Sequence, residues 1–186
     1  MMKLVMSVVV LLSVGAAQDL MSPTIDIISE LQKIKDEVRE LRSKNEERVN
    51  VAFSTTLSSS MGVKYFGPHT EATTLVYEHA FINHGNAYDT NTGIFTAPVK
   101  GVYFFNFVVF NPYEEATGVR LLKNGNLVVA ASDNPPGQDT EDTTCNSVTL
   151  LLEKGDQIRL QLIEKRRIYT DSLNRNTFSG HLLFTV

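Results

Sequence analysis

The sequence predicts an all-β domain, built as a ten-strand antiparallel sandwich and preceded by a short coiled-coil helix. Three observations carry this prediction. After Val49, phenylalanine and tyrosine become frequent, and short apolar runs are separated by turn residues at strand-like spacing. One run, GVYFFNFVVF from Gly101, is apolar at both alternating sets of positions, which indicates a strand covered on both faces. Upstream of Val49, the apolar residues instead follow a heptad spacing.

The first residues have the pattern of a secretory signal peptide, predicted over residues 1–17. Lys3 precedes an apolar run from Leu4 to Leu12, and small residues follow up to Ala17. The run is too short for a membrane-spanning helix. We therefore expect a secreted, extracellular protein without membrane insertion.

Residues 18–50 are predicted to form a coiled-coil stalk. Apolar residues recur with gaps of four and three, which places Leu31, Val38 and Asn45 at a and Ile27, Ile34 and Leu41 at d. A lone helix with a narrow apolar stripe is marginal in water, so the stripe must be buried. Isoleucine at d favours three or four copies of the chain, and packing on the chain's own domain is the alternative.

Residues 51–186 are predicted to form the β-domain. The expected strands cover residues 51–55, 74–82, 87–88, 93–96, 101–110, 119–123, 126–132, 147–153, 157–163 and 177–185. Asn124-Gly125 is a strong hairpin signal, and Lys154-Gly155 is a second turn. Because a two-sheet sandwich has one internal face per sheet, we expect another subunit to cover the second face of the strand from Gly101.

The net charge is -4, and the chain has one cysteine. The acidic balance argues against a nucleic-acid partner, which would need a basic face. An intrachain disulfide is impossible, and we expect Cys145 to be a small buried residue at the start of a strand. An interchain bridge or a reactive thiol is the alternative.

Several spaced residues resemble the signature of the C1q globular-domain family over residues 51–186. The matching residues are Asn83, Tyr88, Phe95, Gly101, Tyr103, Phe105, Phe107 and, near the end of the chain, Gly180. Tyr77 and His181 stand where the family has Phe. The resemblance implies a ten-strand jelly roll, similar to tumour necrosis factor, that assembles as a homotrimer. Because no collagen-like Gly-X-Y repeat is present, the chain resembles the short secreted, cerebellin-like branch.

The acidic loop SDNPPGQDTEDTTCNS gathers carboxylates, which calcium prefers. The resemblance implies that Asp142 is the best match to a calcium ligand of the family and Asp133 a weaker one. A solvated acidic loop is the alternative, and we expect no required cofactor.

Lys165, Arg166 and Arg167 form a basic triplet between two predicted strands. Such a triplet would hold a sulfated glycan, the phosphate of lipid A or an acidic receptor patch, and a trimer would present three copies. A solvated hairpin tip is the alternative.

We find no catalytic motif, since His69, His79, His84 and His181 are scattered and Cys145 has no indicated base. The sequence therefore predicts a secreted, trimeric, non-enzymatic binding protein. Its first expected role is pattern recognition in innate immunity, with microbial glycans or lipopolysaccharide as ligands. The alternative is a cerebellin-like ligand for a cell-surface receptor.

Overall fold

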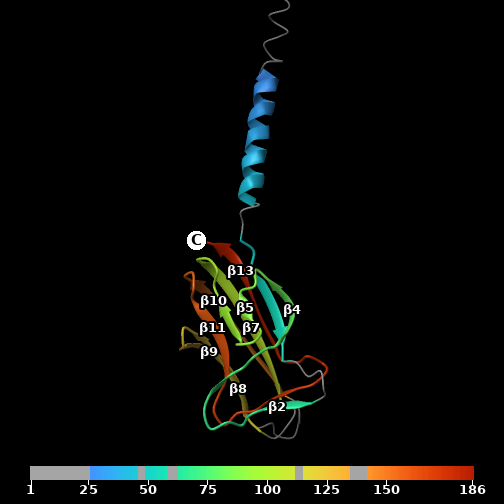
Figure 1. Cartoon of the computed structure of the whole chain (residues 1–186), viewed down its shortest axis with the longest axis vertical. Helices are drawn as coiled ribbons and strands as arrows, with labels where there is room; N and C mark the ends of the chain where they lie inside the picture. Colours follow the sequence, from blue (N-terminus) through green and yellow to red (C-terminus); the bar gives the residue numbers. More distant parts are fainter. Residues whose placement is uncertain (1–25, 46–48, 58–62, 112–114, 135–141) are drawn as a thin grey trace, which may run out of the picture. The chain divides into compact units, whose positions relative to one another are not determined.

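The computed structural model describes residues 26–45, 49–57, 63–111, 115–134 and 142–186. These residues form two units, a helix over residues 26–45 and a β-domain from Val49 to Val186, which we call the head (Figure 1). The helix confirms the predicted N-terminal helix. Within the described part of the chain, no helix is long and apolar enough to cross a bilayer. The predicted signal peptide lies outside the described residues.

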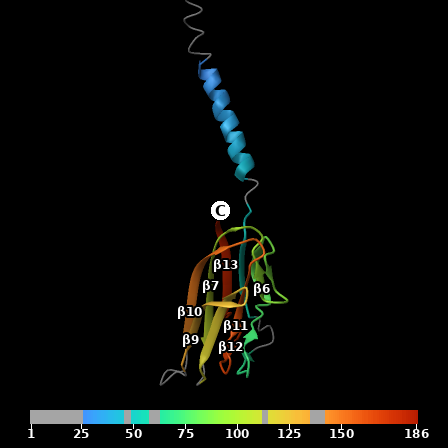
Figure 2. The same ribbon diagram turned by 90° about the vertical axis from the view of Figure 1, so that its left-hand side faces the viewer.

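The head is an antiparallel two-sheet sandwich, as predicted. The first sheet has five strands in the order β10 (Asp142–Leu152), β7 (Gly101–Asn111), β13 (Thr177–Thr185), β1 (Ala52–Thr56) and β4 (His79–His84). Its long strands β7, β10 and β13 run side by side in both views (Figures 1 and 2). β7 is central to this sheet, because β10 and β13 pair with its two sides.

The second sheet has six strands. Five of them follow the order β5 (Tyr88–Asp89), β6 (Ile94–Thr96), β11 (Gln157–Leu162), β8 (Thr117–Lys123) and β9 (Asn126–Asp133), and β3 (Thr73–Thr74) also pairs with β11. A separate two-stranded sheet joins β2 (Lys64–Phe66) to β12 (Ile168–Thr170). In Figure 1, β2 lies at the end of the head far from the C-terminus.

The described residues hold thirteen strands rather than the expected ten. β2 and β12 are new, and the strand expected over residues 74–82 is divided between the two sheets. The amide of Leu75 donates to the carbonyl of Leu160 over 2.9 Å, which holds this segment on β11, whereas β4 pairs with β1. Strand propensity indicates that a segment fits a pleated, half-buried surface, but it does not indicate to which sheet the strand belongs. The sequence therefore did not predict that the chain passes from the second sheet to the first between β3 and β4.

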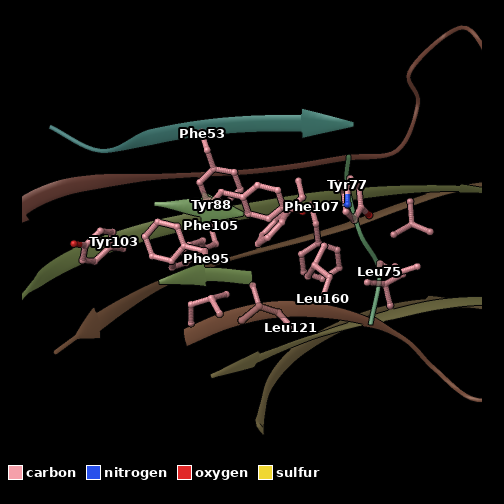
Figure 3. Packing of buried hydrophobic residues seen from close by; sticks show 14 of the residues in the cluster. Phe53, Leu75, Tyr77, Tyr88, Phe95, Tyr103, Phe105, Phe107, Leu121 and Leu160 are labelled. Carbon is pink, nitrogen blue, oxygen red and sulfur yellow. Dashed lines mark hydrogen bonds between the residues drawn. The ribbon is translucent and has the colours of Figure 1, made fainter. Parts of the chain in front are cut away.

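Aromatic rings from both sheets fill the space between them (Figure 3). Phe53 of β1 points into the core, where its ring stacks on Tyr88 at 4.8 Å and meets the edge of Phe178 at 4.9 Å. Phe95 of the second sheet meets the edge of Phe105 at 5.2 Å. Stacked and edge-to-face pairs of this kind contribute about 0.5 to 1.5 kcal/mol beyond the buried area.

Gly180 permits this close packing. A Cβ atom at this position would lie 2.6 Å from ring atoms of both Phe53 and Phe105. Both rings are buried and cannot move aside without disturbing the stack. The backbone of β13 therefore has to approach the rings without a side chain.

Asparagine side chains tie the edges of the two sheets together. The amide of Asn83 on β4 donates to the carbonyl of Tyr88 on β5 over 2.7 Å, and its oxygen accepts the Tyr88 N–H. On the opposite edge, Asn146 of β10 donates to the carbonyl of Ala130 on β9 over 2.8 Å. These bonds occupy backbone groups that an open sheet edge would leave unpaired.

Two hairpin turns interlock through Asp156. The predicted turn at Asn124-Gly125 is confirmed between β8 and β9, with left-handed φ angles of 50° and 85°. The Asp156 carboxylate accepts hydrogen bonds from the side chains of Asn124 at 2.8 Å and Lys123 at 2.9 Å. These two bonds lower the pKa of Asp156 to about 2, so the carboxylate stays ionised at neutral pH and joins the turns.

The hydroxyl of Tyr77 is buried without a hydrogen-bond partner in the part of the chain that the structure describes. Burial also raises the pKa of Tyr77, so the phenol is neutral. The Tyr77 backbone N–H, by contrast, donates to the Tyr88 hydroxyl over 3.1 Å. A buried hydroxyl without a partner costs about 1 to 3 kcal/mol.

We predict that Tyr77→Phe raises the free energy of unfolding by about 1 kcal/mol, because it removes the unpaired hydroxyl and keeps the ring. Tyr103→Phe is the matched control, since its hydroxyl donates to the carbonyl of Val99 over 2.8 Å. That variant should lower the free energy of unfolding by about 1 kcal/mol. Urea denaturation of the three proteins checks this. Equal destabilisation by both substitutions would show that Tyr77 has a partner.

Candidate assembly face and binding loops

β7 presents apolar side chains to both sides of its sheet. Four alternate residues are fully buried against the second sheet, namely Tyr103, Phe105, Phe107 and Val109. The intervening residues point the other way and are only half-buried, namely Val102, Phe104, Asn106 and Val108. The expected two-faced strand is therefore present, and a single chain covers only one of its faces completely.

The strand register extends this second set into a face across the whole sheet, which we call the outer face. It comprises Val102, Phe104, Asn106 and Val108 of β7, Cys145, Ser147, Thr149 and Leu151 of β10, Thr177, Ser179, His181 and Phe184 of β13, Ala52 and Ser54 of β1, and Ile82 and His84 of β4. None of these residues is Asp, Glu, Lys or Arg. Leu151, Phe184 and Ile82 are 53%, 52% and 50% exposed. An uncharged, partly apolar face of this extent is typical of a protein–protein contact.

One end of the second side of β7 is covered by the chain itself. Phe110 is 4% exposed, although we expected another subunit to cover this side of the strand. The ring of Tyr169 lies 5.9 Å from the Phe110 ring, and the guanidinium of Arg175 lies 4.0 Å above it. The prediction of an external cover is therefore wrong at Phe110, because β12 and the segment after it cover the ring.

Cys145 lies on the outer face and is exposed, so the prediction of a buried cysteine is wrong. β10 begins at Asp142 rather than at the expected Ser147, and Cys145 pairs with Val108. Alternate residues of a strand point to opposite sides, so this register turns Cys145 away from the core.

His181 also lies on the outer face. Its ring is 5.5 Å from the Phe104 ring on the neighbouring strand β7. On its other side, His181 pairs with Ala52 of β1. The side chain is exposed in the single chain. His181, which replaces the Phe of the family signature, therefore places a polar ring within an uncharged face.

The structure gives the three members of the basic triplet different surroundings. Arg166 donates to the backbone carbonyl of Asp133 over 2.8 Å. Arg167 forms an ion pair with Glu115 at 3.0 Å and is half-buried. Lys165 is exposed and forms no ion pair with any described residue. Two of the three cations thus contact the head itself, and Lys165 is the member that extends into solvent.

Two tyrosines that the sequence analysis missed support the loop that carries the basic triplet, which we call the basic loop. Tyr65 of β2 and Tyr169 of β12 face each other in register, with ring centroids 5.3 Å apart. The Arg167 guanidinium lies 5.3 Å from the Tyr65 ring, a cation–π contact. Tyr65 remains 46% exposed. Each tyrosine sits in a three-residue strand, which is too short to give a periodic signal.

The predicted calcium ligands are only partly described. Asp133 is exposed at the end of β9, and its carboxylate accepts the Asn134 N–H over 2.8 Å. Asp142 begins β10, and its side chain, like residues 135–141, lies outside the described part. Within the described residues, no group of three or more His, Cys, Asp or Glu side chains is arranged to hold a metal. Calcium binding stays a prediction.

The residues that carry the resemblance lie mostly in the core. Those classed as buried are Tyr88, Phe95, Gly101, Tyr103, Phe105, Phe107 and Gly180. Asn83 is half-buried and joins the sheet edges, as described above. These positions therefore support the fold rather than form a binding surface.

Comparisons with known proteins agree with this architecture. The family model described as "C1q domain" matches residues 42–183. Caprin-2 of Danio rerio is 32% identical over 138 residues, which are 74% of this chain and 14% of that protein. Complement C1q tumor necrosis factor-related protein 3 of Mus musculus is 37% identical over 112 residues, which are 59% of this chain and 44% of that protein. The chain thus spans less than half the length of either relative.

Solved structures show the same fold at low sequence identity. The globular domain of zebrafish complement 1qA protein has a TM-score of 0.55 at 20% identity, over 73% of this chain and 99% of that domain. Murine APRIL has a TM-score of 0.56 at 11% identity, over 73% of this chain and 100% of that protein. These similarities confirm the predicted C1q and tumour necrosis factor-like sandwich.

We predict that Arg167→Glu lowers the free energy of unfolding by about 1 to 2 kcal/mol. The change removes the ion pair and the cation–π contact and places a second carboxylate beside Glu115. Lys165→Glu is the matched control and should change stability by less than about 0.5 kcal/mol, because Lys165 is exposed. Chemical denaturation of both variants distinguishes the two residues. Equal stability of both would contradict the supporting role of Arg167.

Proposed function

Because the chain belongs to the C1q domain family, we propose that it is a secreted, homotrimeric and non-enzymatic binding protein. Members of the C1q and tumour necrosis factor-like families form trimers and bind ligands or receptors. The outer face carries the proposal for this chain. It is broad, uncharged and only half-buried in one copy, which is what a subunit interface requires.

The proposed role is multivalent recognition of microbial surface glycans or lipopolysaccharide in innate immunity. Lys165 supports it, since its exposed ammonium can bind an anionic sugar. Tyr65, whose ring Arg167 of the same triplet contacts, is 46% exposed and offers an aromatic surface. A trimer would carry three such loops, and linked weak contacts gain about 10²- to 10⁴-fold in avidity. The weakness of a single loop is therefore compatible with useful binding.

We predict that Phe104→Glu converts the head from a trimer into a folded monomer. Phe104 is half-buried at the centre of the outer face, and a buried carboxylate without a partner would oppose association. Leu127→Glu is the matched control, because Leu127 lies on β9 and is 63% exposed. Sedimentation equilibrium gives the masses, and circular dichroism shows that both variants fold. A trimeric Phe104→Glu variant, or a monomeric wild type, would contradict assembly through the outer face.

For the ligand, we expect the trimer to bind whole bacteria and to be displaced by soluble lipopolysaccharide or polysaccharide. Lys165→Glu should weaken this binding by about tenfold or more, because each trimer loses three cations. Lys154→Glu, which changes another exposed lysine in a turn, serves as the control and should bind as the wild type does. Saturable binding to animal cells that sugars do not displace would instead favour the cerebellin-like alternative.

A further inference from the structure

The helix over residues 26–45 presents an apolar stripe that nothing in the described part of the chain covers. Its five apolar heptad residues are 41% to 65% exposed, namely Ile27, Leu31, Ile34, Val38 and Leu41. Ile28, at an e position beside the stripe, is 61% exposed and widens it at the start of the helix. Most of the stability of such an amphipathic helix comes from packing of its apolar face, so the stripe requires a partner.

The charges beside the stripe differ from those on the rest of the helix. On the remaining surface, Arg39 forms an ion pair with Asp36 within the helix at 3.3 Å. Lys44, at the last g position beside the stripe, contacts Glu40 within the helix at 2.7 Å. Lys35 and Arg42 at e positions and Glu37 at a g position form no ion pair with described residues. Glu30, also at g, contacts only Lys33, at 3.7 Å.

These flanking charges are complementary between copies of the same chain. In parallel, in-register helices, a g residue faces the e residue that lies five positions further along in its neighbour. Glu30 would then face Lys35 of the next copy, and Glu37 would face Arg42. Both pairings join opposite charges. An antiparallel pair centred on this helix would instead bring Glu37 near Glu37 and Lys35 near Lys35, which repels, and would leave only Glu30 and Lys44 as an opposite pair.

We propose that the helix is a parallel, in-register, homotypic coiled coil of three copies, whose e and g charges set its orientation and select identical chains. The three-fold state rests on the homotrimer proposed above and is favoured by isoleucine at the d positions of Ile27 and Ile34. The occupant of the apolar stripe is thus the same helix of the other subunits. The orientation places all three heads at the same end of the coiled coil.

The test uses disulfide cross-linking of the full mature chain. Cys145→Ser removes the native thiol, and Leu31→Cys then places one thiol at an a position of the helix. Leu31 meets its own copy only in a parallel, in-register coil, so mild oxidation should produce covalent dimers. Ser29→Cys, at the outward f position, is the matched control and should not cross-link efficiently.

Charge reversal tests the pairing rule in the same Leu31→Cys background. Glu30→Lys with Glu37→Lys should slow cross-linking by about tenfold or more, because every interchain pair becomes repulsive. Adding Lys35→Glu and Arg42→Glu should restore it, since all pairs are again opposite in sign. High salt should reduce the difference between these variants.

Sedimentation equilibrium of the same samples separates this inference from the proposed trimer. A trimer in which Leu31→Cys fails to cross-link would overturn the parallel coil and leave assembly through the head. Cross-linking that is unaffected by the double reversal, or not restored by the quadruple change, would overturn the charge rule. A monomeric wild-type chain would overturn the proposed homotrimer itself.

Discussion

The arrangement of the head follows from the need to cover both faces of β7. This uncharged strand of eleven residues lies in the middle of the five-stranded sheet, paired on both sides. The second sheet covers one face, and β12 with the segment after it covers the end at Phe110. The rest of the outer face stays half-exposed in a single chain. Because apolar surface is unfavourable in water, the same constraint that organises the core also provides a reason for assembly.

Aromatic packing in the interior and asparagine hydrogen bonds at the edges both hold the two sheets together. The rings of Phe53, Phe105 and Phe178 pack closely only because Gly180 lets the backbone of β13 approach them. The hydrogen bonds of Asn83 and Asn146 lie at the two open edges of the sandwich, where stacking cannot reach. The aromatic rings thus pack the interior, and the asparagine hydrogen bonds occupy backbone groups at the sheet edges that could otherwise pair with other chains.

Two of the three basic side chains in the loop with Lys165, Arg166 and Arg167 make contacts within the head and stabilise the loop itself. Arg166 donates a hydrogen bond to the backbone carbonyl of Asp133. Arg167 pairs with the Glu115 carboxylate and lies over the Tyr65 ring, two contacts to which the planar guanidinium is well suited. Their contacts position the loop. The backbone N–H of Lys165 donates to the carbonyl of His69 over 2.8 Å, but its ammonium takes no part in this support and is the group that remains for recognition. Binding residues placed on a loop over a rigid scaffold are common among recognition proteins.

The sequence by itself determined the N-terminal helix, the two-sheet sandwich, the two-faced strand from Gly101 and the hairpin at Asn124-Gly125. Each depends on local periodicity or turn chemistry, which neighbouring residues encode. Tertiary structure decided which sheet receives β3 and β4, the exposure of Cys145 and the cover over Phe110. It also decided the partners of Arg166 and Arg167, which lie more than thirty residues away in sequence for Asp133 and more than fifty for Glu115. Such contacts depend on register and chain crossing, and no local pattern contains that information.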